Sequence, residues 1–190
     1  MTGKICVLLL IVIACAFGAQ AQKSFENDKR SVLDYYRLEP DNALDSEAMR
    51  AKVAIEDLKN GYLKIEGAFE GYIEVALFRK KDRSPLLVTS INYCGPVCSS
   101  DVSVYQYRDG KMVSAPEATL PHPDEKEINR IYRKKKTKQD EEPEQYAVPL
   151  VFELPRYGRT IKVKVDSTYA PSDITIYQLD FKNDEFVLIR

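Results

Sequence analysis

The chain has 190 residues and a net charge of −1, because 28 lysines and arginines stand against 29 aspartates and glutamates. Such a near-neutral balance argues against a dedicated nucleic-acid-binding protein, which carries a clear basic excess. Four cysteines are too few for a disulfide-dense scaffold, so the fold must rest on its apolar core.

The first 21 residues have the features of a secretory signal peptide. Lys4 is their one charged residue, an apolar stretch runs from Ile5 to Phe17, and Ala19-Gln20-Ala21 forms an A-x-A cleavage site. The apolar stretch is shorter than the roughly 20 residues that a membrane span needs, and no later segment comes near that length. We therefore predict that residues 1–21 are removed and that the mature chain does not span a membrane.

A second interpretation of the same segment is a bacterial lipoprotein signal. Val12-Ile13-Ala14-Cys15 loosely matches a lipobox, in which the cysteine becomes the lipidated first residue. Phe17 so soon after that cysteine is atypical of lipoproteins, and the A-x-A site downstream is well formed. We favour a secreted or periplasmic protein, and a lipid anchor at Cys15 stays the alternative.

Residues 22–60 are predicted to form an N-terminal leader. Its first part, residues 22–33, is polar, as is typical of a frayed terminus. Ser46 to Ile55 has the composition of a short helix, with an extended segment as the alternative. Asn60-Gly61 marks a turn, after which the main β-rich domain, residues 61–190, begins.

From Tyr62 onward the sequence is dominated by alternating apolar and polar residues, as a half-buried antiparallel sheet requires. Asp109-Gly110 and Asn183-Asp184 are typical of hairpin turns, and Asp124 to Lys136 predicts a helix that is acidic at its start and basic at its end. The fold class predicted is mainly β with one or two short helices, in an antiparallel two-sheet or sandwich-like arrangement. The predicted strands are 62–66, 72–78, 86–93, 102–107, 111–113, 146–154, 160–165, 174–181 and 186–189.

One internal similarity raises the hypothesis of a tandem. The segment Asp101 to Tyr107 resembles Asp173 to Leu179, and each follows a loop and leads into a hairpin. The corresponding half-units, 61–115 and 124–190, would each contain about four strands. Alternating strands resemble one another by chance, so coincidence stays the other interpretation.

Cys94-Gly95-Pro96-Val97-Cys98 is the most distinctive motif. In an oxidising compartment the default expectation is a disulfide between Cys94 and Cys98. Thioredoxin-like redox sites use two intervening residues at a helix N-terminus, whereas this motif has three and lies between two predicted strands. We therefore favour a structural disulfide over a redox pair. Metal ligation is disfavoured, since a structural zinc site needs four ligands and only one histidine exists.

No complete catalytic constellation emerges from the remaining candidates. His122, between Pro121 and Pro123, lacks a nucleophile signature such as Gly-x-Ser-x-Gly, and a solvated loop histidine is the simpler interpretation. Paired carboxylates could support glycoside hydrolysis, but the spacing selects no pair. The acidic candidates at strand ends are Glu66, Glu70, Glu74 and Glu153.

Two further features bear on binding. The basic run Arg133 to Lys138 could bind an anionic polysaccharide, a lipid head group or nucleic acid, although the acidic residues that follow it favour a solvated helix end. Tyr105, Tyr107 and Tyr177 on the predicted strands could form a binding face for a sugar or a protein. The alternative for these tyrosines is cross-strand packing within the sheets.

Several segments together resemble a set of small secreted β-rich proteins of Bacteroidetes-type bacteria. The resemblance rests on the Cys94–Cys98 motif, the terminal hairpin, and the segments Asn60 to Gly67, Gly71 to Phe78 and Leu154 to Gly158. It implies export and a compact β-rich domain, and it supplies no functional residue.

The sequence thus favours a secreted or periplasmic, non-enzymatic domain that binds an extracellular protein or a glycan without a cofactor. A small secreted hydrolase that uses carboxylates is one alternative. A thiol-disulfide protein that uses Cys94 and Cys98 is the other.

Overall fold

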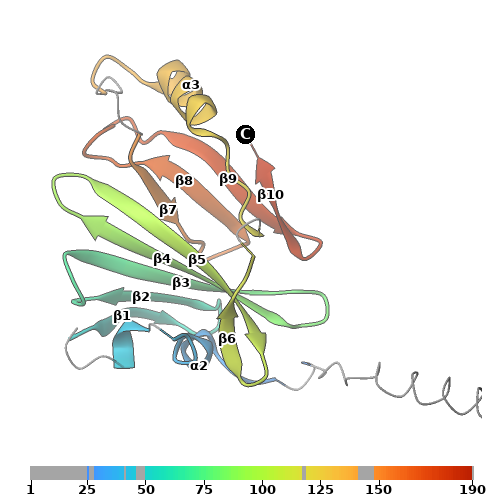
Figure 1. The fold of residues 1–190 in the computed structure, drawn as a ribbon. Helices are drawn as coiled ribbons and strands as arrows, with labels where there is room; N and C mark the ends of the chain where they lie inside the picture. Colours follow the sequence, from blue (N-terminus) through green and yellow to red (C-terminus); the bar gives the residue numbers. More distant parts are fainter. Residues whose placement is uncertain are drawn as a thin grey trace, which may run out of the picture.

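The computed structural model describes residues 25, 28–40, 42–45, 50–116, 119–140 and 148–189 (Figure 1). The predicted signal peptide and Cys15 lie outside these residues, so their processing stays a prediction. Within the described part of the chain, no helix is both long and apolar enough to cross a membrane.

The first half of the chain forms a six-stranded antiparallel sheet, here called the large sheet. Each strand pairs with the next along the sequence, so the spatial order is β1-β2-β3-β4-β5-β6. The strands are β1 (Lys52–Asp57), β2 (Tyr62–Glu66), β3 (Gly71–Arg79), β4 (Pro85–Cys94), β5 (Cys98–Arg108) and β6 (Lys111–Ser114).

The second half forms a four-stranded antiparallel sheet, here called the small sheet, in the order β10-β9-β8-β7. Its strands are β7 (Leu150–Glu153), β8 (Thr160–Val165), β9 (Thr175–Lys182) and β10 (Glu185–Ile189). The two antiparallel sheets confirm the predicted fold class. The predicted half-unit 61–115 contains the five strands β2 to β6 and the half-unit 124–190 contains the four strands β7 to β10, and a common origin for them stays a prediction.

Local turn chemistry explains where the hairpins close. Asp109 and Gly110 have φ angles of 48° and 89°, and Asn183 and Asp184 have φ angles of 49° and 70°. Positive φ at both central residues is what a type I′ hairpin turn needs, because its twist matches that of the strands. Both predicted hairpins are therefore confirmed.

Among the described residues, the sheets are accompanied by the helices α2 (Val32–Tyr36) and α3 (Glu125–Lys135) and the 3₁₀ turn η2 (Ala43–Asp45). Ser31 caps α2 in a capping box with Asp34, and Asp124 caps α3 by accepting a hydrogen bond from the Glu127 amide at 2.8 Å. Such caps satisfy amides that the first helical turn leaves unpaired. The helix predicted from Asp124 to Lys136 is confirmed.

The main core lies between the two sheets. Phe78 and Val88 of the large sheet belong to one buried cluster with Ile161, Leu179 and Phe181 of the small sheet. Phe78 contacts Phe181 and Phe186 with ring centroids 5.2 and 5.0 Å apart. Figure 1 shows the small sheet beside β4 and β5, with α3 at its far end.

A second core covers the other face of the large sheet. Val32, Tyr35 and Tyr36 of α2 are buried with apolar side chains of the large sheet. The described part of residues 22–60, predicted as an N-terminal leader, thus helps to shield Leu63, Ile65, Val75, Leu87 and Met112 from water.

The short helix predicted from Ser46 to Ile55 is wrong where it can be compared. Residues 52–57 form β1, and Val53 pairs with Ile65 of β2, as the extended alternative requires. Residues 46–49 lie outside the described residues. Pairing with β2 overrides the modest helix propensity of this segment, as tertiary context often does.

Candidate functional site

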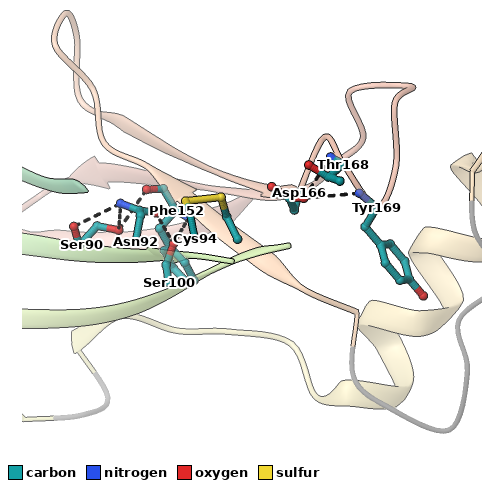
Figure 2. Close-up of a disulfide and its surroundings, with 9 residues drawn as sticks. Ser90, Asn92, Cys94, Ser100, Phe152, Asp166, Thr168 and Tyr169 are labelled. Atoms are coloured by element: carbon teal, nitrogen blue, oxygen red, sulfur yellow. Dashed lines mark hydrogen bonds between the residues drawn. A yellow bond between two sulfur atoms is a disulfide. The ribbon is translucent and has the colours of Figure 1, made fainter. Parts of the chain in front are cut away.

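Side-chain hydrogen bonds, rather than a continuous strand ladder, join β7 to the large sheet. The Phe152 amide donates to Ser100 Oγ at 2.9 Å, and Ser90 Oγ donates to the Phe152 carbonyl at 3.1 Å. Asn92 accepts from Ser100 Oγ at 2.5 Å, so one hydroxyl both accepts from β7 and donates to β4. Figure 2 shows this cluster beside the yellow disulfide bond.

Glu74 adds to these hydrogen bonds between the large sheet and the segment that contains β7. We call this set of contacts, made by Glu74, Ser90, Asn92, Ser100, Phe152 and Leu154, the seam. The Glu74 carboxylate accepts from the Leu154 amide at 2.9 Å and from the Tyr62 hydroxyl at 2.7 Å. Burial raises the pKa of Glu74, although both hydrogen bonds act in the opposite direction. Glu74, Ser90 and Asn92 are buried, and each polar contact satisfies a group that would otherwise be costly to bury.

A pocket of about 420 Å³ opens next to this seam. One wall is the first half of β5, a second is formed by Phe152, Tyr177 and Leu179 of the small sheet, and a third by the connection from β6 to α3. Its volume falls within the range typical of small-ligand sites. The residues that line it are Ser100, Asp101, Val102, Ser103, Val104, Ser114, Ala115, Pro116, Leu120, Pro121, His122, Phe152, Tyr177 and Leu179.

Tyr177 is the most unusual residue of this lining. Its side chain is 2% exposed, and burial alone raises its pKa to about 12. Its ring meets Phe152 edge to face, with centroids 6.4 Å apart. The Tyr177 hydroxyl is not a buried polar atom that lacks a hydrogen-bond partner.

The other polar groups of the lining are three serines, Asp101 and His122. His122 is exposed, and its Nδ1 lies 3.2 Å from the Pro123 carbonyl. Asp101 is the one carboxylate among the described lining residues. The pocket therefore does not present the pair of acids that the hydrolase alternative needs.

The four carboxylates considered from the sequence have other surroundings. Glu66 pairs with Lys64 at 3.2 Å, and Glu153 pairs with Lys164 at 2.9 Å. Both oxygens of Glu74 accept structural hydrogen bonds, and Glu70 is exposed in the β2–β3 turn. None of the four lines the pocket.

The cysteine pair forms the predicted disulfide. Cys94 and Cys98 are the last cross-strand pair of the β4–β5 hairpin, with Cα atoms 4.1 Å apart. Strand β5 begins at Cys98, so neither cysteine lies at a helix N-terminus, the position that would lower a thiol pKa. The position of the disulfide suits a structural link. Among the described residues, no group of three or more His, Cys, Asp or Glu side chains is placed to hold a metal ion.

The three predicted tyrosines do not form one exposed face. Tyr105 is buried in the core under α2, and Tyr177 is buried between the sheets. Tyr107 is half-buried and lies beneath the Arg30 guanidinium, 4.2 Å from its ring centroid. Tyr105 is covered by the N-terminal segment and Tyr177 by the packing of the two sheets, so these two side chains lie in different cores.

Sequence reasoning missed the seam and the pocket that adjoins it. Ser90 and Asn92 interrupt an otherwise apolar strand, and such polar residues at buried positions signal a hydrogen-bonded junction. His122 was considered alone, although it lines a pocket with Tyr177. The basic run begins at the end of α3, where Arg133, Lys134 and Lys135 are exposed.

Comparison with known proteins gives little further guidance. No family model matches the chain, and no curated protein matches its sequence. The fold is weakly similar to a domain of an uncharacterized protein from Porphyromonas gingivalis W83, with a TM-score of 0.39 and 13% sequence identity. The match covers 76% of this chain and 83% of that one.

Proposed function

We propose that this chain is an exported, non-enzymatic binding domain that holds a neutral glycan in the inter-sheet pocket. The observation that carries the proposal is Tyr177, whose nearly buried ring lines the pocket edge to face with Phe152. A tyrosine supplies an apolar ring together with a hydroxyl group, a combination that suits the apolar faces and hydroxyl rim of a sugar.

The chemistry of the lining supports a sugar unit. A sugar ring presents apolar C–H faces together with a rim of hydroxyl groups. The pocket offers the rings of Phe152 and Tyr177 beside the hydroxyls of Ser103 and Ser114. No lysine or arginine is among its described lining residues, whereas Asp101 is, so a neutral ligand fits better than an anionic one.

Export is supported by the Cys94–Cys98 disulfide, since such links persist in oxidising compartments. The predicted cleavage site after Ala21 adds to this support. Mass spectrometry of the protein from its native host tests the point. A mature N-terminus at Gln22 is expected, whereas a lipidated Cys15 would identify an anchored protein instead.

The glycan proposal is tested by titrating neutral oligosaccharides against the mature protein. A panel of β-linked and α-linked glucans, xylans and mannans serves as the probe in calorimetry. Tyr177→Phe removes one oxygen and keeps the ring, so we expect a dissociation constant about threefold to tenfold higher with an unchanged fold. Tyr157→Phe is the matched control, because Tyr157 is 69% exposed and lies outside the pocket lining.

Three results would count against the proposal. Intact protein that binds no oligosaccharide of the panel at millimolar concentration would overturn the glycan, and equal affinity of Tyr177→Phe and wild type would overturn the site. Release of reducing ends during incubation would show turnover and favour the hydrolase alternative.

A protein partner is the second candidate, because one exposed aromatic surface lies at the β4–β5 hairpin tip. Tyr93 is 47% exposed and contacts Phe69 with ring centroids 5.1 Å apart. The disulfide closes the hairpin beside them, and a rigid aromatic pair is typical of interface anchors. Loss of a co-purifying partner in Tyr93→Ala, with oligosaccharide binding retained, would support this candidate.

A further inference from the structure

The exposed side of α3 carries a basic hollow that the inter-sheet pocket does not include. Its lining residues are Lys126, Asn129, Arg130, Arg133 and Lys134. The cationic residues recur at intervals of three, four and seven or eight, so they lie along one side of the helix. We call this surface the basic face.

Most of this positive charge is not neutralised by ion pairs. Arg130 pairs with Glu127 at 2.6 Å. Lys126, Arg133 and Lys134 make no ion pair within the described part of the chain. An unpaired cationic row of this kind is a ready contact for sulfate or carboxylate groups.

The acidic residues at the two ends of α3 have other roles. Asp124 caps the helix through the Glu127 amide. Asp140 accepts from the Thr137 amide at 2.6 Å and from Ser172 Oγ at 2.7 Å, and these bonds lower the pKa of Asp140 to about 2. Both acids stay near the helix and reduce its field, but neither pairs with the three free cations.

The opposite side of α3 is fixed in the core. Tyr132 is fully buried, and its ring lies 5.9 Å from that of Tyr169. Ile128 and Ile131 pack against the same core cluster, and Lys135 Nζ donates to the Thr175 carbonyl at 2.7 Å. The helix therefore cannot turn an apolar side toward a membrane, as interfacial helices do.

Asn129 lies among the residues that line the same hollow. Its Oδ1 is buried and has no hydrogen-bond partner among the described residues. A ligand in the hollow does not reach that buried oxygen, so the contacts to an anionic ligand come from the basic side chains.

We propose that the basic face binds an anionic polysaccharide. Sulfate or carboxylate groups contact Lys126, Arg133 and Lys134. Nucleic acid fits less well, because the described residues that line the hollow include no aromatic side chain to stack on a base and the chain as a whole has a net charge of −1. This site is separate from the pocket and does not depend on the glycan proposed there.

The test uses the full mature protein and heparin oligosaccharides as the probe, titrated between 50 and 300 mM salt. The triple variant Lys126→Gln, Arg133→Gln and Lys134→Gln should weaken binding about tenfold or more at low salt. The slope of log affinity against log salt should fall by about two, because fewer counterions are released.

The matched control is Lys52→Gln, Lys59→Gln and Lys111→Gln, which removes the same charge from three exposed lysines of the large sheet. We expect it to bind heparin within about twofold of wild type. Equal weakening by both triples would show a diffuse charge effect and overturn the site. Failure of the wild type to bind at 50 mM salt would overturn the proposal.

Further probes identify the class of partner and show whether the basic face and the inter-sheet pocket bind independently. Single-stranded DNA and anionic phospholipid vesicles are tested against wild type and against the triple variant of α3, here called the α3 triple. If either probe binds wild type more tightly than heparin does, and the α3 triple loses that binding, the partner is a nucleic acid or a membrane and not a polysaccharide. Neutral oligosaccharides should bind the α3 triple as they bind wild type, so failure at one site does not decide the other.

Discussion

The large sheet and the small sheet are both antiparallel meanders, in which each strand pairs with the next along the chain. They differ in how their faces are covered. In β4, the six residues from Pro85 to Ser90 are all buried, whereas in β8 buried residues alternate with less buried ones. The N-terminal segment covers one face of the large sheet, and the small sheet covers the other.

This difference shows that antiparallel strands of one protein can be buried on both faces, as in β4, or mainly on one face, as in β8. A strand with one wet face must alternate, but a strand with two covered faces can be apolar throughout. Leu86-Leu87-Val88 is such a continuous run. The second core under α2 covers the face of this sheet that the inter-sheet core leaves open.

The largest expected effect tests whether both faces of the large sheet stabilise the fold. Leu87 faces α2 and Val88 faces the small sheet, and neither side chain is exposed. Leu87→Ala should lower the free energy of unfolding by about 2–5 kcal/mol, and Val88→Ala by about 1.5–3 kcal/mol. Urea denaturation measures both. A cost below 1 kcal/mol for Leu87→Ala would show that the N-terminal segment is only a loose cover.

The next effect concerns the polar seam between the sheets. Glu74→Ala leaves the Leu154 amide and the Tyr62 hydroxyl without their acceptor, so we expect a loss of about 2–4 kcal/mol in the free energy of unfolding. Retention of full stability would mean that water replaces the carboxylate and that the seam contributes little.

The pH dependence of the free energy of unfolding gives a second test of Glu74. Burial raises its pKa above the ordinary 4.5, so the folded protein holds this proton more tightly than the unfolded chain. Wild type therefore loses stability relative to Glu74→Gln as the pH rises from about 4.5 through the raised pKa. Urea denaturation of both proteins at pH 4.5 and 7.5 should show the variant gaining at the higher pH, and a constant difference would contradict the raised pKa.

A smaller effect is expected at the tip of the β4–β5 hairpin. Replacing both Cys94 and Cys98 with serine opens a short covalent loop, which should cost about 2 kcal/mol on the chain-entropy model. Thiol titration of the wild type, before and after reduction, provides the control. Two free thiols in the native protein would contradict the disulfide.

The smallest effect is expected at the surface link between the sheets. Arg156 Nε donates to Asp57 Oδ2 at 2.8 Å and joins the end of β1 to the segment after β7. Exposed ion pairs contribute little, so Asp57→Asn should leave the denaturation midpoint unchanged within error. A clear loss would show that the sheets depend on this link as well as on the buried seam.

The sequence predicted the hairpins and strands well because their signals are local. Asp109-Gly110 and Asn183-Asp184 adopt the positive φ angles that their composition favours. The packing of the N-terminal segment was not predicted because its partner surface is distant in sequence: Tyr35 lies near Tyr107, with ring centroids 5.8 Å apart. No local sequence pattern within residues 28–45 indicates that contact.

The candidate site was predictable only in fragments. The composition identified His122 and Tyr177 as residues of interest, but their meeting in one pocket depends on how the β6–α3 connection crosses between the sheets. The opposite error occurred for Tyr105, whose exposure was inferred from a one-sided sheet. Burial of a strand residue depends on what covers each face, which periodicity alone does not specify.

The seam also determines where another polypeptide could extend the small sheet by strand addition. The outer edge of β7 has its Phe152 amide and carbonyl, and its neighbour the Leu154 amide, already engaged by side chains. That edge therefore cannot template a foreign strand. Within the described residues, β10 is the free edge of the small sheet, so β-augmentation or self-polymerisation through this sheet would have to begin there.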